Sequence, residues 1–249
     1  MLRAWLEKPL RPGATTVTLS PEESGHLVRS LRARRGDVVV VLDGSGMIAE
    51  GRLSSADGNA AIIELLKVSR APESFPHVTL VQSMPKGGTM DDLVRSVAEA
   101  GVNEIQPLMT ARCEVRLDAE RSQAKAERWR DQVIEACKQC GNPWAAKVQT
   151  PNYFRAWCDA LPPITEGELR LTASLEIDAE PVGLLRLTGI TRVVWLVGPE
   201  GDLNPEELAA ARHAGFRPIS LGHAVLRAEN AALACIIATQ VLSQQVKHS

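Results

Sequence analysis

The chain of 249 residues has little of what marks secreted or membrane proteins. Its first residues, MLRAWLEKPLRPG, lack the apolar core of a signal peptide. No run approaches the roughly 18 consecutive apolar residues of a transmembrane helix. The five cysteines are scattered and odd in number, which suits a reduced cytosol better than a disulfide framework. We therefore expect a cytoplasmic protein without a membrane partner.

Two nucleotide-binding motifs are also missing. The glycines form neither G-x-G-x-x-G nor G-x-x-x-x-G-K-[ST], so the commonest dinucleotide and phosphate loops are excluded. The net charge of -2 argues against a protein that coats nucleic acid indiscriminately. Cys137 and Cys140 form a lone C-x-x-C in a helical stretch, with neither a second pair nor a nearby histidine. We expect no metal there, although a metal or redox role stays open.

Length and composition are those of an ordinary globular protein. A chain of this length accommodates one or two domains, and its contents of 45% hydrophobic and 23% charged residues are typical. Residues 70–73 form a polar junction that contains a proline. We place the domain boundary there, with domains at 1–72 and 73–249.

The stretch from 191 to 241 contains two apolar strands, each followed by a glycine loop and a helix. The first strand, Val193–Val197, is β-branched and suits a buried parallel sheet. It ends at the loop GPEGD, residues 198–202. Asn204 is then a suitable N-cap, Pro205 fits the first helical position, and Glu207 completes a capping box. A helix to about residue 214 follows.

The second strand, 218–221, leads into the loop GHAVLR, residues 222–227. The final helix, about 228–241, is apolar on nearly every face. Such a helix is buried, either in the core or against a second subunit, and we expect a homodimer through it. Glycine loops at the carboxyl ends of parallel strands commonly bind ligands. Ordinary strand–helix turns are the alternative, and the spacing names no ligand.

GPEGD followed by LGHAVLRAEN resembles the signature pair of the SPOUT methyltransferases, and most closely the RsmE family. That family methylates N3 of one uridine in the 16S rRNA of the small ribosomal subunit. The resemblance implies S-adenosyl-L-methionine as cofactor and small-subunit rRNA or the 30S subunit as partner. The implied fold is α/β: a SPOUT domain with a C-terminal trefoil knot, preceded by a small PUA-like β-barrel. Pattern arguments alone would not propose a knot.

The N-terminal segment fits this resemblance. Ser20, Pro21 and Glu23 have the spacing of a helix start. Short strands are expected at 38–42, 47–54 and 60–68, with tight turns between them. The segment HLVRSLRARRGDVVVVLDGSG, residues 26–46, resembles the N-terminal PUA-like domain of the RsmE family. Such a domain would help to hold rRNA.

Strands and helices alternate in the second domain, which indicates an α/β fold. Strands are expected at 78–84, 105–109 and 169–173, and helices at 91–100 and about 119–140. Residues 175–190 show no usable periodicity. The helix at 119–140 carries a buried stripe that includes Trp129 and Val133.

Site residues follow from the resemblance and from the loops. Glycines would allow close backbone approach, and apolar residues would form the walls. The expected cofactor-binding residues are Thr172, Ala173, Val197, Gly198, Pro199, Glu200, Gly201, Leu221, Gly222, Val225, Leu226 and Asn230.

Two residues beside the second loop are catalytic candidates. Arg227 is expected to stabilise charge on the uracil oxygens, and Glu229 to orient the substrate or accept the N3 proton. The alternative for Arg227 is a salt bridge to Glu229 or Glu200. The alternative for Glu229 is an acid favoured by the helix dipole.

Basic side chains are the candidates for RNA contact. Four arginines fall within residues 29–35. A charge cluster by itself is usually a solvated face, but this cluster lies beside a histidine and a strand, as expected of an RNA-contacting rim. The expected RNA-binding residues are Arg29, Arg32, Arg34, Arg35, Lys86 and Arg112.

The chain also departs from the family pattern. Asp202 replaces a second glycine, Ala228 and Asn230 replace the threonines that flank Glu229, and Asn142 replaces an arginine. These departures leave two rivals open. One is a non-catalytic RNA-binding or ribosome-assembly protein of the same fold. The other is a SPOUT methyltransferase with another RNA target, including a ribose 2′-hydroxyl.

Overall fold

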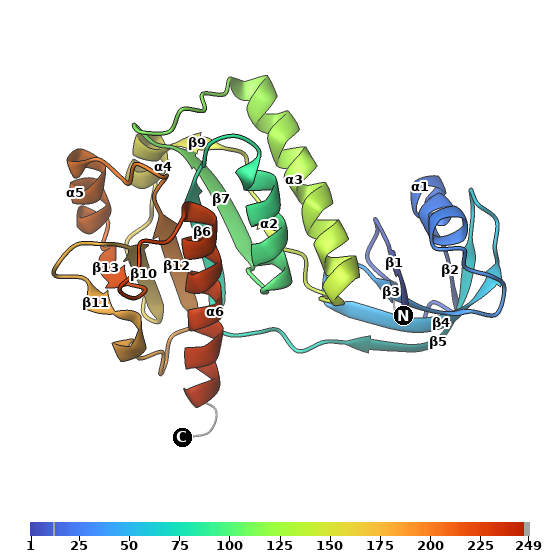
Figure 1. Cartoon of the computed structure of the whole chain (residues 1–249). Coiled ribbons are helices and arrows are strands. Elements are labelled where there is room, and N and C mark those ends of the chain that lie inside the picture. The colour runs from blue at the N-terminus through green and yellow to red at the C-terminus, as the bar shows by residue number, and fades with distance from the viewer. Residues whose placement is uncertain (12, 247–249) are drawn as a thin grey trace. The chain divides into compact units, whose positions relative to one another are not determined.

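The computed structural model describes residues 1–11 and 13–246, which divide into two compact units (Figure 1). The first unit holds residues 1–73 together with 133–145, and the second holds 74–132 and the residues from 146 onward. The sequence did not anticipate that 133–145 would join the first unit.

The first unit is built on a five-stranded, mostly antiparallel sheet in the order β1-β3-β4-β5-β2. Only β1 and β3 run parallel. One face of the sheet is buried, and its core includes Val39, Val41, Leu53 and Ile63. The strands are β1 (Leu2–Trp5), β2 (Thr16–Thr18), β3 (Val38–Leu42), β4 (Met47–Ser55) and β5 (Ile62–Arg70).

The expected helix start at Ser20 is confirmed. Helix α1 (Pro21–Gly25) begins there, and the Ser20 hydroxyl accepts a hydrogen bond from the Glu23 N–H. A π-helical turn, η1 (His26–Ser30), continues it. The buried Glu23 carboxylate accepts the Trp5 N–H and forms an ion pair of 3.0 Å with Lys138. Burial lowers the pKa of Lys138, but its hydrogen bonds to carboxylates outweigh that effect and raise it.

The second unit contains an entirely parallel sheet of eight strands. The order is β11-β13-β10-β12-β6-β7-β8, and β9 also pairs with β7. Its central strands read as continuous apolar runs because both faces are covered. The strands are β6 (His77–Ser83), β7 (Glu104–Met109), β8 (Lys147–Val148), β9 (Asn152–Tyr153), β10 (Glu168–Ala173), β11 (Glu180–Pro181), β12 (Arg192–Val197) and β13 (Arg217–Ser220).

Helices cover both faces of this sheet. Val194 and Leu196 of β12 belong to a core with α4 (Phe154–Asp159) and α5 (Pro205–His213). Trp195 of the same strand points the other way, and its indole N–H donates to Thr239 of α6 (Ala228–Val246) at 2.8 Å. Helix α2 (Thr89–Glu99) lies beside α6 (Figure 1). A short 3-10 turn, η2 (Val182–Leu184), follows β11.

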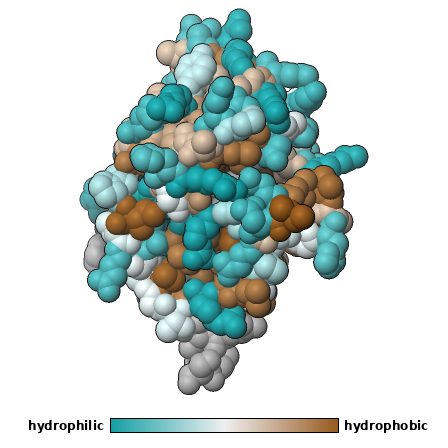
Figure 2. Space-filling view, turned by 90° about the vertical axis from the view of Figure 1, so that its left-hand side faces the viewer, coloured by the Kyte–Doolittle hydropathy of each residue, from teal (hydrophilic) through white to brown (hydrophobic). Residues whose placement is uncertain are grey.

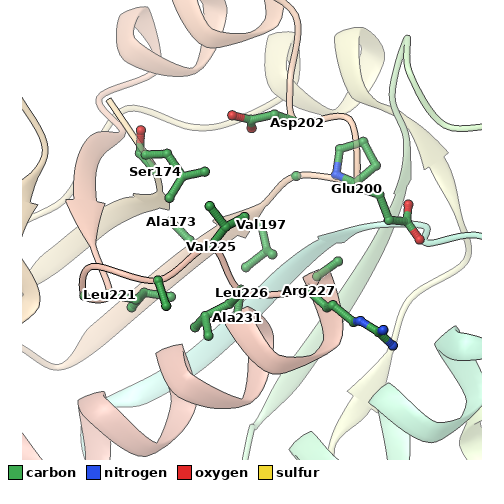
Figure 3. A pocket seen from close by; sticks show the side chains of 16 residues that line it. Ala173, Ser174, Val197, Glu200, Asp202, Leu221, Val225, Leu226, Arg227 and Ala231 are labelled. Carbon is green, nitrogen blue, oxygen red and sulfur yellow. The ribbon is translucent and has the colours of Figure 1, made fainter. Parts of the chain in front are cut away.

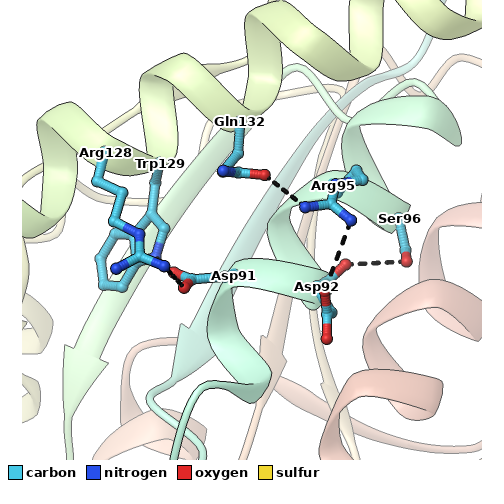
Figure 4. A network of polar contacts seen from close by, with 7 residues as sticks. All are labelled: Asp91, Asp92, Arg95, Ser96, Arg128, Trp129 and Gln132. Atoms are coloured by element: carbon cyan, nitrogen blue, oxygen red, sulfur yellow. Dashed lines mark hydrogen bonds and ion pairs between the residues drawn. The ribbon is translucent and has the colours of Figure 1, made fainter.

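Helix α3 (Ala119–Cys140) has the limits that the sequence predicts. A polar network joins its first part to α2 (Figure 4). The Asp91 carboxylate accepts the indole N–H of the buried Trp129 at 2.9 Å and pairs with Arg128 at 2.5 Å. Arg95 donates to Gln132 at 2.8 Å. These contacts hold α3 against α2, and the loop before α2 contains Lys86, whose N–H donates to Glu200 of the site described below.

The register of the parallel strands brings three carboxyl ends to one edge of the sheet. Thr172 of β10 pairs with Leu196 of β12, and Ala173 pairs with Ile219 of β13. No helix among the described residues is long and apolar enough to cross a membrane. The trefoil knot implied by the resemblance stays a prediction.

Candidate functional site

A cavity of about 270 Å³ opens where β10, β12 and β13 end (Figure 3). The loop after β12 forms one wall, and the loop after β13 together with the start of α6 forms the other. The lining residues are Ala173, Ser174, Leu175, Val197, Gly198, Pro199, Glu200, Asp202, Leu221, Gly222, Ala224, Val225, Leu226, Arg227, Ala228 and Ala231.

The loop after β12, residues 198–203, is held by neighbouring loops. The Arg112 guanidinium donates to the carbonyl oxygens of Gly201 at 2.6 Å and Leu203 at 3.3 Å. The Lys86 N–H donates to the Glu200 carboxylate at 2.9 Å. Side chains and main chain from the ends of β6 and β7 therefore fix this wall.

The expected capping box at the start of α5 is confirmed. The Asn204 side chain accepts the Glu207 N–H at 2.7 Å, and the Glu207 carboxylate accepts the Asn204 N–H at 3.0 Å. The other Glu207 oxygen accepts the Ala111 N–H at 2.7 Å. One buried carboxylate thus accepts main-chain hydrogen bonds from the start of α5 and from the loop after β7.

The loop after β13, residues 221–227, has few such contacts. The Ser220 hydroxyl bonds to the main chain of Gly222, and the Arg227 carbonyl accepts the first helical N–H from Ala231. Val225 is 76% exposed and Leu226 is 37% exposed. This wall is shaped mainly by the strand and helix at its two ends.

Nine of the twelve expected cofactor-binding residues line the cavity, and three do not. Thr172 is buried within β10, one residue before the lining begins. Gly201 faces Arg112, since a Cβ at Gly201 would lie 3.5 Å from the Arg112 Cδ. Asn230 is exposed on the first turn of α6. The assignment of these residues to a cofactor stays a prediction.

The two catalytic candidates differ in position. Arg227 lines the cavity, and Figure 3 places its side chain at the same end as Glu200, away from Ser174. Glu229 is half-buried on α6 and is not part of the lining. Within the described residues, no ion pair or hydrogen bond engages the Arg227 guanidinium. The alternative of a salt bridge to Glu229 or Glu200 is therefore not formed.

Several lining residues were missed as ligand contacts. Leu175 lies in the segment without periodicity, and Ala224 and Ala231 carry no distinctive side chain. Asp202 was visible only as a departure from the family pattern. Ser174 lines the cavity beside Ala173.

The expected RNA-binding residues fall into two groups. Arg29 donates to the Gly58 carbonyl and to Asn59, so it closes a turn of the first unit. Lys86 forms an ion pair of 2.6 Å with Glu114, and the hydrogen bond from that carboxylate raises the Lys86 pKa. Arg112 holds the loop after β12.

The remaining basic candidates are Arg32, Arg34 and Arg35, and all three are exposed. Their guanidiniums have no ion pair or hydrogen bond to any other described residue. Arg32 also has a left-handed backbone, with φ at 57°. This part of the cluster is free to contact an anionic partner.

The C-x-x-C pair has the features of structural thiols. Cys137 is buried and Cys140 is exposed. Burial raises the pKa of the Cys137 thiol to about 12, and the neighbouring Cys140 adds to that shift. The Cys137 thiol is therefore protonated at neutral pH, a state unsuited to nucleophilic attack. Among residues 1–11 and 13–246, no group of three His, Cys, Asp or Glu side chains could hold a metal ion.

Two family models match the chain. One, described as an RNA methyltransferase domain, matches residues 72–240. The other, described as an RNA methyltransferase PUA domain, matches residues 19–66. The first covers most of the second unit, including both loops of the cavity.

Named relatives extend over most of the chain. The ribosomal RNA small subunit methyltransferase E of Synechocystis sp. is 34% identical over 220 residues, which cover 87% of this chain and 70% of that protein. Its counterpart from Mycobacterium tuberculosis is 29% identical, with 94% and 88% covered. The crystal structure of a ribosomal RNA small subunit methyltransferase E from Neisseria gonorrhoeae, bound to S-adenosyl methionine, is 34% identical. Its TM-score is 0.85, and 97% of this chain and 98% of that chain are covered.

Proposed function

Because the chain belongs to the family of RNA methyltransferases with a PUA domain before a SPOUT-type α/β domain, we propose that it methylates a uridine of small-subunit rRNA. The acceptor is N3 of one uridine in 16S rRNA, and the methyl donor is S-adenosyl-L-methionine. The observation that carries the proposal is the cavity between the two glycine loops, which is lined by most residues of the signature pair, although not by Gly201, Glu229 or Asn230.

The residues that line the cavity suit this cofactor. The cavity volume of about 270 Å³ lies just below the roughly 300–1,000 Å³ of small-molecule pockets. Leu221, Val225 and Leu226 provide apolar surface for a flat base, and the loop main chain provides polar groups. Gly222 has φ at 136°, and a Cβ there would meet no atom within 4 Å. The absence of a side chain at Gly222 keeps this space open.

When bound, the cofactor supplies an electrophilic methyl group. The protein must hold the acceptor nitrogen in line with it, and positioning provides much of the acceleration. The Arg227 guanidinium, which no described carboxylate neutralises, stabilises negative charge on the uracil oxygens as the N3 proton leaves. Glu229 lies two residues along, where it accepts that proton or orients the base.

Rival functions make different predictions. Two observations favour a protein that binds RNA without methylating it. Ala228 and Asn230 stand where the family has threonines, and Glu229 does not line the cavity. Such a protein leaves the rRNA of its host unmodified. A methyltransferase with another target modifies a different nucleotide or a ribose hydroxyl.

The test is mass spectrometry of 16S rRNA from a strain that lacks the gene. We expect one N3-methyluridine to disappear and to return when the natural protein is supplied. Supplying Arg227→Ala should not restore it, whereas Arg155→Ala should. Arg155 is an exposed arginine paired with Asp159 on α4, and it serves as the matched control. An unchanged methylation pattern in the deletion strain would refute the activity.

RNA binding is assigned to the free arginines of the first unit. Arg32, Arg34 and Arg35 contact phosphates, which gives affinity rather than sequence choice. Reversing Arg34 and Arg35 to glutamate should weaken rRNA binding across sequences and flatten its salt dependence. Replacing Arg29, which is engaged by Gly58 and Asn59, should change the salt slope less. Unchanged rRNA binding after the double charge reversal would indicate that these arginines only form a solvated surface.

The proposed assembly is a homodimer in the cytoplasm. Ile237 is 44% exposed and Val241 is 51% exposed on α6, while the opposite face of that helix packs on the sheet. A two-fold pair of these helices would bury both side chains. Figure 2 shows one face of the molecule, on which small brown patches are separated by polar side chains. The exposed Ile237 and Val241 are the reason for assigning the interface to α6.

A further inference from the structure

Asp202 has an uncommon position in the loop after β12. Its φ is 62°, in the left-handed region that side chains other than Asn and Asp rarely adopt. The family pattern has a glycine there. One carboxylate oxygen accepts the N–H of Leu203 at 2.7 Å. The side chain lines the cavity (Figure 3).

The Asp202 carboxylate occupies space beside the tight turn. A Cβ placed on Gly198 would lie 2.9 Å from the Asp202 Oδ1. A side chain at position 198 would therefore clash with the Asp202 carboxylate, and glycine avoids this clash. The other oxygen, Oδ2, has no hydrogen bond or ion pair to the described part of the chain.

The charged groups of the cavity do not balance. Its ionisable lining residues are Glu200, Asp202 and Arg227, which gives two acids and one base. Lys86 does not offset the excess, because its ammonium is paired with Glu114. The lining therefore carries one net negative charge and favours a cationic ligand over a neutral one.

We propose that Asp202 makes the cavity discriminate between the methyl donor and its demethylated product, an inference that rests on the proposed function. S-adenosylmethionine carries one more positive charge than S-adenosylhomocysteine, at its sulfonium. Methyl transfer returns the C–S electron pair to sulfur and removes that charge. The carboxylate attracts the donor and has no corresponding charge to attract in the product, so it favours binding of the donor over binding of the product.

The expected effect is moderate because Asp202 is exposed. A charge pair near the surface is weakened by solvent, and salt screens it over about 10 Å at 0.1 M. We expect Asp202 to strengthen donor binding by roughly threefold to tenfold at low salt. The contribution should shrink as the salt concentration rises.

A purely structural role predicts a different result. If Asp202 served only to hold the Leu203 N–H and the left-handed backbone, its replacement would affect both ligands alike. Asp202→Asn separates the two roles, because asparagine keeps the acceptor oxygen and tolerates this backbone while losing the charge.

The experiment is isothermal titration of the full-length protein with S-adenosylmethionine and with S-adenosylhomocysteine, at low and high salt. Asp202→Asn should weaken donor binding by roughly threefold to tenfold and leave product binding unchanged. Glu206→Gln is the matched control: it removes the same charge from α5, where the carboxylate has no partner among described residues and lies outside this cavity. In Glu206→Gln, the ratio of the affinity for S-adenosylmethionine to that for S-adenosylhomocysteine should equal the ratio in the natural protein.

An equal loss for both ligands, or an unchanged ratio of affinities in Asp202→Asn, would overturn the inference. If that variant does not fold, Asp202→Gly supplies the same comparison, because glycine adopts this backbone without strain. Failure of the natural protein to bind either ligand would instead refute the proposed function. The two failures are thus distinguishable.

Discussion

The two walls of the cavity are built on the same plan and held in different ways. Each is a parallel strand, a glycine loop and a helix. The loop after β12 is held by Arg112, by the Lys86 N–H and by the capping box at Asn204. The loop after β13 has exposed side chains from 222 to 227 and almost no contacts beyond its own ends.

This difference separates a preformed wall from an adaptable one. A loop fixed by hydrogen bonds loses little conformational freedom when a ligand binds, whereas a loosely held loop must be ordered at that moment. Val225 and Leu226 are exposed in the single chain, so a ligand or a second copy gains most by covering them. The loop after β12 therefore fixes the shape of the cavity before a ligand binds. The loop after β13 becomes ordered when the cavity is occupied.

The largest effect is expected in the adaptable wall. Gly222→Val places a β-branched residue at φ 136°, which only glycine adopts without strain, and adds bulk at the cavity lining. We expect cofactor affinity to fall by roughly a hundredfold or more, a loss of about 3 kcal/mol. Isothermal titration measures it. Gly183→Val is the control, since Gly183 has no neighbouring atoms within 4 Å and lies outside the cavity. Equal affinities for Gly222→Val and the natural protein would show that this wall is not part of the site.

The helix that follows the same loop provides the next test. Ile237→Asp puts a charge on the exposed apolar face of α6, and burying an unpaired charge at an interface is costly. We expect the natural protein to be a dimer at micromolar concentration and the variant to dissociate at least about tenfold more readily.

Light scattering and sedimentation give the mass. The exposed Ile177, outside α6, is the control position for the same substitution. A natural protein that is monomeric at micromolar concentration would contradict the dimer.

A substitution in the preformed wall, the loop after β12, should lower the free energy of unfolding. Glu207→Ala removes acceptors for the N–H groups of Asn204 and Ala111, so the free energy of unfolding should fall by about 1–3 kcal/mol. Denaturant unfolding measures the change. Glu206→Ala, one residue earlier in the same helical turn, should cost less than about 0.5 kcal/mol. Similar losses in both variants would mean that the capping box does not stabilise this wall.

The smallest effect concerns the contact between loops. Arg112→Ala removes the donor to the carbonyls of Gly201 and Leu203 but leaves the capping box in place. We expect roughly threefold weaker cofactor binding, because the wall becomes less well ordered before binding. Arg112→Lys should recover part of the affinity. A loss larger than that of Gly222→Val would reverse the assignment of the two walls.

Local patterns were sufficient for the main elements of the second unit. Helix α3 begins and ends where its apolar stripe predicts, and the N-cap of α5 is the one its sequence indicates. Strands β1 and β2, which span four and three residues, were not predicted from the sequence. Segment 133–145 groups with the first unit through contacts such as the pairing of Lys138 with Glu23, which joins residues 115 positions apart and leaves no local pattern.

The sequence by itself determined that two glycine loops follow buried strands, and that GPEGD and LGHAVLRAEN form one signature. Composition, caps and apolar runs are local properties, so they can be read without knowing the fold. The family resemblance rests on the same local residues.

Only the tertiary structure decided which residues face the cavity and which cations are free. Strand alternation and the pairing of Ala173 with Ile219 place Thr172 inside the sheet and Ala173 at the cavity. Arg112 and Arg29 are predicted RNA contacts, and the fold brings each to a carbonyl oxygen far along the chain. A hydrogen bond depends on distance in space, and that distance is set by how the strands pair.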